Sequence, residues 1–239
     1  MKRMALLASS LWLLCGAAFA GPPYLTDDPV PTDFGHYEIF VYGAGTLVPG
    51  GADSEAGIDF NFGGAPRLQL SATLPLVMNA SGASGIGNIE LGAKYRFLTQ
   101  EGFGVDLAFF PHVNFSSLSA SVGDRRMSLF LPLWAQRDFG KWSIFGGGGC
   151  TLNHSRFSND FCEAGLAVTR EVVDGMRVGA EIFHAGAGEP GGKANTALGF
   201  GATWDVDAHH HLLAYWGPNL TNASVNGRAN FYAALLFTF

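Results

Sequence analysis

Charged and polar side chains recur at every second position of several apolar stretches of this 239-residue chain. In 67–77 and 87–98 they alternate with leucine, isoleucine and aromatic residues, so each stretch has one polar and one apolar face. Eleven charged residues fall on such polar faces: Glu38, Asp59, Arg67, Glu90, Lys94, Arg96, Asp106, Arg126, Glu163, Arg177 and Glu181. Because the two signs nearly balance, we expect either an ion-paired network that stiffens a wall or a narrow polar conduit for a small solute.

Cys150 and Cys162 are the only cysteines after residue 20. They are symmetric about residue 156, the middle of the expected loop 153–160, so a simple hairpin places them opposite each other. An exported protein meets conditions in which such a pair can oxidise. The spacing predicts a cross-strand disulfide near the outer rim, and the alternative is two free thiols on a lipid-facing surface.

Other candidates for metal binding and catalysis are weaker. Asp27-Asp28 could hold a hard cation, but adjacent carboxylates in a proline-rich segment are more typical of turns. Of the three histidines at 209–211, at most two can share one face of a strand. His154 and Ser155 are adjacent and would face opposite ways, whereas a nucleophile and its base must meet. We expect no metal site, no cofactor and no catalytic residue.

The elements that carry these residues are expected to be strands, because the apolar pattern has a period of two. Twelve are expected, at about 36–47, 55–62, 67–77, 87–98, 103–115, 126–136, 141–152, 161–170, 176–185, 195–206, 209–216 and 228–239. Short connections (63–66, 99–101, 138–140, 171–175, 207–208) alternate with longer ones (48–54, 78–86, 116–125, 153–160, 186–194, 217–227). This pattern is typical of an all-β, up-and-down outer-membrane barrel with short periplasmic turns and longer extracellular loops. A soluble sandwich or barrel is the alternative.

In such a barrel the polar faces line the lumen, together with inward aromatic residues: Phe40, Tyr42, Phe110 and Trp134. The last strand shows the pattern most clearly, because Phe231, Leu235, Phe237 and Phe239 share one apolar face. In a soluble protein this face would expose an aggregation-prone edge, whereas in a membrane barrel it meets lipid and the strand pairs with the first one. A terminal strand of this kind also resembles the signal read by the barrel assembly machinery of bacteria.

The chain has the marks of export. Lys2 and Arg3 precede an apolar run, and Ala18-Phe19-Ala20 forms a small-x-small cleavage site, so residues 1–20 are expected to be a signal peptide. Only 14% of the residues are charged, against about 25% in soluble domains. Loss of Lys2 and Arg3 takes the net charge from −6 to −8, which disfavours nucleic-acid binding. We expect the outer membrane of a Gram-negative cell, with its lipid, as the location.

Residues 21–34 are rich in proline and aspartate and show no alternation, which predicts a periplasmic extension or an inward-folded plug before a barrel over 35–239. The stretch GPPYLTDDP at 21–29, followed by an aromatic strand with Glu38, resembles a family of bacterial outer-membrane proteins. That family is described as components of the MetA pathway of phenol degradation, or as transporters. The resemblance implies passive passage of small solutes, aromatic or hydrophobic ones included. The alternatives are a structural or adhesive barrel without a conducting lumen, and an outer-membrane lipid hydrolase.

Overall fold

The computed structural model describes residues 23–116, 119, 122, 127–153 and 158–239. The expected signal peptide lies outside these residues, as do Arg126, His154 and Ser155. The described chain forms β1 (Tyr37–Val48), β2 (Gly51–Ala65), β3 (Leu68–Met78), β4 (Ser84–Ile86), β5 (Ile89–Leu98), α1 (Gln100–Phe103), β6 (Asp106–Phe109), β7 (His112–Phe115), β8 (Ser128–Phe139), β9 (Trp142–Asn153), β10 (Phe161–Val173), β11 (Met176–Ala185), β12 (Asn195–Asp205), β13 (His210–Pro218), α2 (Ala223–Asn226) and β14 (Ala229–Thr238).

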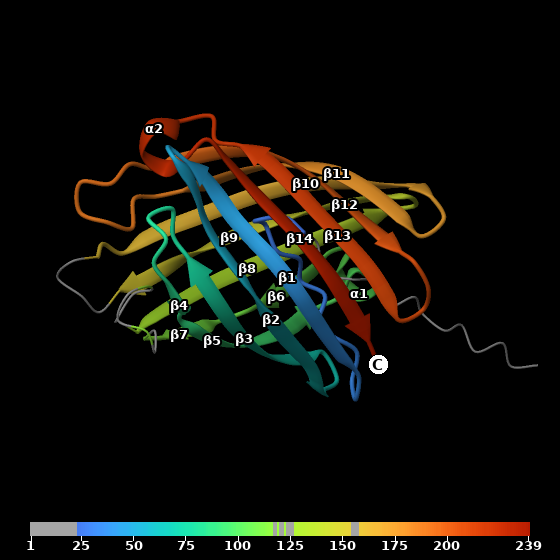
Figure 1. Cartoon of the computed structure of the whole chain (residues 1–239). Coiled ribbons are helices and arrows are strands. Elements are labelled where there is room, and N and C mark those ends of the chain that lie inside the picture. Colours follow the sequence, from blue (N-terminus) through green and yellow to red (C-terminus); the bar gives the residue numbers. More distant parts are fainter. Residues whose placement is uncertain (1–22, 117–118, 120–121, 123–126, 154–157) are drawn as a thin grey trace, which may run out of the picture.

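These strands close into one antiparallel barrel (Figure 1). The first strand pairs with the last, with Glu38 opposite Thr238, so neither is left as a free edge. Two of the barrel's strands are each interrupted. β4 and β5 both pair with β3, and β6 and β7 both pair with β5 and β8. The ring therefore contains twelve strands with two extra segments, which confirms the fold class expected from the alternating pattern.

The interruption between β6 and β7 coincides with a residue that cannot continue a regular ladder. Pro111, between β6 and β7, has no backbone N–H to donate. The expected strand 103–115 also begins later than expected, because Phe103 ends the one-turn helix α1. Gly104 follows in the left-handed conformation, with φ of 77°, and turns the chain back into the barrel wall.

One expected loop is absent. The stretch 48–54 reads as a loop because it is rich in glycine and proline, yet Val48 lies opposite Gly51 in the register of β1 and β2. The two strands are joined by Pro49 and Gly50 alone, and Gly50 has φ of 89°, which glycine adopts without strain. The ladder therefore extends further than the alternation of side chains indicated.

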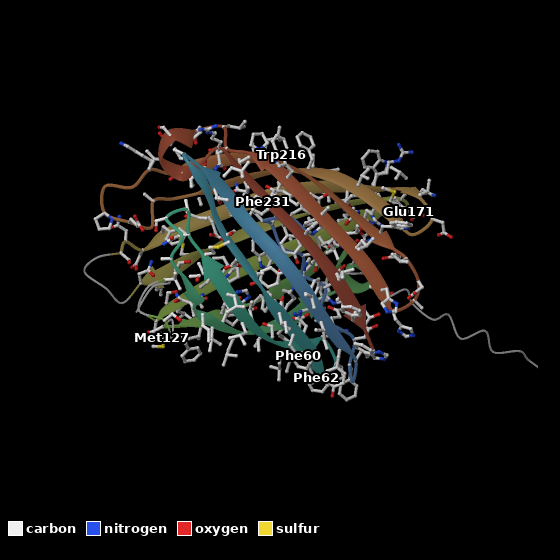
Figure 2. All side chains as sticks on the ribbon, viewed as in Figure 1. Phe60, Phe62, Met127, Glu171, Trp216 and Phe231 are labelled. Carbon is white, nitrogen blue, oxygen red and sulfur yellow. A yellow bond between two sulfur atoms is a disulfide. The ribbon has the colours of Figure 1, made fainter. Side chains whose placement is uncertain are left out.

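Side chains sort to the two faces of the wall as the alternation predicts. On β14, Leu235 is 47% exposed on the outside, whereas its neighbour Leu236 is 1% exposed on the inside. Figure 2 shows Phe60, Phe62 and Trp216 projecting away from the barrel. At the end where short turns join the strands, the ring of Tyr37 stacks on that of Phe62, with centroids 4.8 Å apart. Aromatic residues of this kind mark the membrane–water boundary in outer-membrane barrels.

Cys150 and Cys162 lie directly opposite each other on β9 and β10 and are joined by a disulfide. Cys162 is exposed on the outer face, one position from the inward Glu163. No helix in the described part of the chain is long and apolar enough to cross a membrane.

Candidate functional site in the barrel lumen

Residues 23–35, here called the N-terminal segment, contact inward side chains on opposite parts of the barrel wall. The segment begins at Pro23, and its prolines keep it out of the sheet ladder. Tyr24 donates a hydrogen bond from its hydroxyl to the carbonyl of Gly201 on β12, at 3.1 Å. Its ring packs against Phe145 of β9 and Tyr215 of β13. Burial raises the pKa of the Tyr24 phenol, so this group stays a hydrogen-bond donor.

The next two residues are held by one carboxylate on β11. The backbone N–H groups of Leu25 and Thr26 donate to the two oxygens of Glu181, at 3.1 and 3.0 Å. Glu181 is only 2% exposed, and Thr26 is fully buried. The position of Thr26 also accounts for the presence of glycine at residue 165 of β10, because any Cβ there would overlap the Thr26 side chain. The absence of a side chain there lets the segment approach the wall.

Lys94 of β5 holds the segment from another side of the lumen. Its ammonium lies 3.1 Å from a carboxylate oxygen of Asp27 and 3.7 Å from one of Asp28. The same ammonium sits over the ring of Phe110, 4.7 Å from the centroid. Lys94 is 4% exposed, so both carboxylates compensate a charge that is shielded from water.

The segment leaves the lumen beside β2 and β3. The backbone N–H and the hydroxyl of Thr32 both donate to the side-chain oxygen of Gln69, and the hydroxyl also contacts Glu38. Gln69 in turn donates to Asn61, at 2.7 Å. The backbone N–H of Gly35 then donates a hydrogen bond to the carbonyl of Gly63 on β2, and β1 begins two residues later. The segment is therefore tied to the wall along its whole length.

One cavity lies on each side of the N-terminal segment. The loop-end cavity, of about 600 Å3, extends toward the β1–β2 turn and is lined by Thr46, Ser54 and Asn230. The turn-end cavity, of about 470 Å3, reaches the short turns at Gly140 and Gly175. Pro23, Tyr24 and Val30 line both cavities. The contacts above place the segment between them.

Nine of the eleven charged residues expected to face inward lie on the inner side of the wall: Glu38, Asp59, Glu90, Lys94, Arg96, Asp106, Glu163, Arg177 and Glu181. Arg96 lies 3.5 Å from Asp106, and Glu90 lies 3.1 Å from His112. The prediction that Arg67 faces inward is wrong. Arg67 is exposed in the β2–β3 turn, with φ of 67°, because β3 begins only at Leu68. Arg126 lies outside the described residues.

The inner wall also contains residues that were not singled out from the sequence. Glu55, Gln69 and His112 occupy the inward positions that the alternation assigns to them, and Tyr215 is an inward aromatic residue of β13. The role of Asp27 as a partner of Lys94 has no local signal, because the two residues meet only across the lumen.

The consecutive histidines near the short turns bond neighbouring carboxylates. The Nδ1 atom of His210 lies 2.8 Å from a carboxylate oxygen of Asp207, and that of His211 lies 2.7 Å from one of Asp205. The ring of His211 is buried and also reaches Thr238 at the end of β14. These contacts tie the β12–β13 turn to the last strand.

The seating of the N-terminal segment is expected to weaken as the pH rises. Burial raises the pKa of Asp28 to about 6, although Lys94 opposes the shift. A released segment would expose this carboxyl, whose pKa would return to about 3.9. Between these values the seated state holds a proton that the released state has lost, so the seated state loses stability as the pH rises through this window. Protease cleavage within the segment should therefore be faster at about pH 7.5 than at about pH 5.

Asp28→Asn is the matched control for this prediction, because an amide in the same place does not titrate. The pH dependence of cleavage should flatten in this variant. An unchanged pH profile in Asp28→Asn would show that another group is responsible.

No family model matches the sequence, and no curated protein does. Among solved structures, the chain is similar to the COG4313 outer membrane channel from Pseudomonas putida F1, with a TM-score of 0.70 and 17% identity over 89% of this chain and 98% of that one. It is also similar to outer membrane phospholipase A from Escherichia coli (TM-score 0.49, 9% identity, covering 90% of this chain and 92% of that one). A third is OmpT of Vibrio cholerae (TM-score 0.41, 11% identity, covering 88% and 100%).

The likeness to the channel shows a shared fold. The other two, with TM-scores below 0.5, carry no argument about this chain. A closed antiparallel barrel with an apolar outer face is the form in which strands cross an outer membrane.

Proposed function

We propose that this protein is an outer-membrane channel for the passive passage of small solutes, and that the N-terminal segment is its constriction. The observation that supports this most directly is the pair of cavities, one on each side of the segment, inside a closed wall. A solute that crosses the barrel must pass the segment, because residues 24–32 bond wall residues on several strands. Passage therefore depends on how tightly the segment is held.

The lining of the loop-end cavity suits a small solute with an apolar or aromatic body. Tyr232 lines it and is stacked on Tyr42, with ring centroids 5.9 Å apart, and the buried Phe40 and Phe110 line it beside the polar groups. Cavities of about 300–1,000 Å3 with apolar walls and a few polar groups are typical of small-molecule sites. We therefore propose aromatic or hydrophobic compounds among the solutes, as the resemblance to the phenol-degradation family implies.

Assembly in the outer membrane follows from the same proposal. The outer face of β14 carries Phe237, and the exposed Phe239 follows its end, so the two would present a C-terminal signal to the barrel assembly machinery. The apolar outer surface would then contact lipid. An inert barrel is the second candidate, because the many contacts of the N-terminal segment could keep the lumen shut.

Conductance in planar bilayers and swelling of proteoliposomes test the proposed function. We expect the purified, folded barrel to give small single-channel currents and swelling with small solutes such as phenol. Phospholipid hydrolysis should not accompany them. If neither wild-type protein nor a variant with a loosened N-terminal segment conducts or swells, the inert structural barrel is the better description. Hydrolysis of phospholipid would instead favour an enzyme.

A further inference from the structure

The loop-end cavity carries an excess of negative charge. Among the described residues that line it, the acidic ones are Asp27, Glu38, Asp53, Glu55, Asp59 and Glu90. Lys94 is the single lysine or arginine in the same described lining. The near balance of charge among the eleven inward candidates does not hold here, since Arg96 and Arg177 line the turn-end cavity.

Lys94 pairs with Asp27, which is one of these six residues, and with Asp28 of the same segment, so the excess is carried by the other five. Glu55 and Asp59 of β2 and Glu90 of β5 lie on either side of β3, and each has a hydroxyl or histidine partner. Their partners are the hydroxyl of Tyr42 at 3.1 Å, the hydroxyl of Thr73 at 3.2 Å and the Nδ1 atom of His112 at 3.1 Å, respectively. Within the described chain, no lysine or arginine nitrogen lies within 4.0 Å of these three carboxylates.

The aromatic lining, like the acidic residues, favours a positively charged solute. Aromatic ring faces attract cations. The cavity already contains one example, since the Lys94 ammonium lies over the ring of Phe110 while it is bound by carboxylates. Tyr232 also lines this cavity and is stacked on Tyr42, whose hydroxyl donates to Glu55, so a second aromatic wall lies near an acidic group. A solute with an ammonium group and a small apolar body would match both features.

We propose that the loop-end cavity selects positively charged organic solutes, preferring an amine with a small apolar or aromatic body over an alcohol or acid of the same shape. Glu55, Asp59 and Glu90 supply the unbalanced charge, and Tyr232 and Phe110 supply the wall for the apolar body. The proposal rests on the proposed channel function, for which it names a class of solute.

The test compares three isosteric probes, benzylamine, benzyl alcohol and benzoate, by equilibrium binding to the purified full-length barrel at a pH where carboxyl groups are ionised. We expect benzylamine to bind on the order of tenfold more tightly than benzyl alcohol, and benzoate to bind least. Currents under a salt gradient provide a second readout, with a reversal potential that shows cation selectivity.

The double variant Glu55→Gln with Glu90→Gln should lose most of the preference for benzylamine and shift the reversal potential toward zero. Its matched control is Glu101→Gln with Glu189→Gln, which removes two charges from exposed positions in α1 and in the 186–194 connection. The control should behave as the wild-type protein does.

Equal binding of benzylamine and benzyl alcohol, or a preference that survives in Glu55→Gln with Glu90→Gln, would overturn the proposal. A preference for benzylamine in a barrel that passes no current would support the cation-selective cavity and refute the channel. A channel that conducts but ignores the charge of the probe would do the reverse.

Discussion

Replacing Glu181 with alanine is expected to raise the single-channel conductance several-fold. The carboxylate accepts hydrogen bonds from the backbone N–H groups of Leu25 and Thr26 in a fully enclosed position. Hydrogen bonds to a charged group contribute about 1.5–3 kcal/mol each, so the N-terminal segment loses about 3–6 kcal/mol of its attachment. The two donors, left without an acceptor, would turn to water, and the segment would leave the lumen.

Two comparisons make this prediction specific. Glu181→Gln keeps one acceptor oxygen, so its conductance should lie between those of the wild-type protein and Glu181→Ala. Glu171→Ala removes a carboxylate from the lining of the turn-end cavity that bonds Lys141 rather than the segment. Figure 2 shows Glu171 near the end of the barrel, far along the wall from Phe231. The conductance of Glu171→Ala should stay close to that of the wild-type protein. If both alanine variants conduct alike, lumen charge and not the segment controls the current.

Lys94→Met should destabilise the seated N-terminal segment by about 3–5 kcal/mol, because the removal of one partner leaves buried charges without compensation. Asp27 and Asp28 would then face each other and the acidic wall with no cation within reach. Limited proteolysis of the folded barrel measures the effect, as cleavage within residues 23–35.

Neutralising both carboxylates distinguishes the ion pair from simple loss of packing. Asp27→Asn with Asp28→Asn, added to Lys94→Met, should restore much of the protection against cleavage. Lys141→Met removes an exposed lysine that also pairs with a glutamate, and exposed pairs contribute at most about 1 kcal/mol. Cleavage of Lys141→Met should match that of the wild-type protein. A triple variant cleaved as fast as Lys94→Met would rule out charge as the cause.

The barrel could be predicted from the sequence because its main determinant is local. The period of two in stretches such as 67–77 fixes which side chains face lipid, and a closed ring is the structure that leaves no unpaired edge in a membrane. The errors fall where local signals are ambiguous. The stretch 48–54 reads as a loop, but only Pro49 and Gly50 form the turn, and Pro111 divides a strand without ending it.

The site was harder to predict, because alternation assigns a side chain to a face but not to a cavity. Nothing in the local pattern indicates that Arg96 lines the turn-end cavity while Glu90, six residues earlier, lines the loop-end cavity. The position of the N-terminal segment was even harder to predict from the sequence. It depends on contacts such as Thr26 with Glu181, which join residues 155 apart in the chain.

A disulfide between the segment and the wall tests most directly whether residues 23–35 constrict the lumen. A Cβ on residue 165 would lie 3.1 Å from the Cβ of Thr26, so the two must separate by a few tenths of an ångström to reach the roughly 3.5–4.5 Å of disulfides. The chain would carry Thr26→Cys and Gly165→Cys in addition to Glu181→Ala, and peptide mapping would identify the new bond beside Cys150–Cys162. Thr26→Cys with Ala164→Cys is the control pair, because Ala164 faces outward and cannot reach the segment.

Single-channel conductance of the oxidised chain, recorded before and after addition of a reductant, is the deciding measurement. If the segment is the constriction, the oxidised chain conducts as little as the wild-type protein, and reduction raises its conductance to that of Glu181→Ala. The control pair and the wild-type protein should not respond to the reductant in this way. A chain that carries the new disulfide yet conducts as well as Glu181→Ala would contradict a constriction formed by the N-terminal segment.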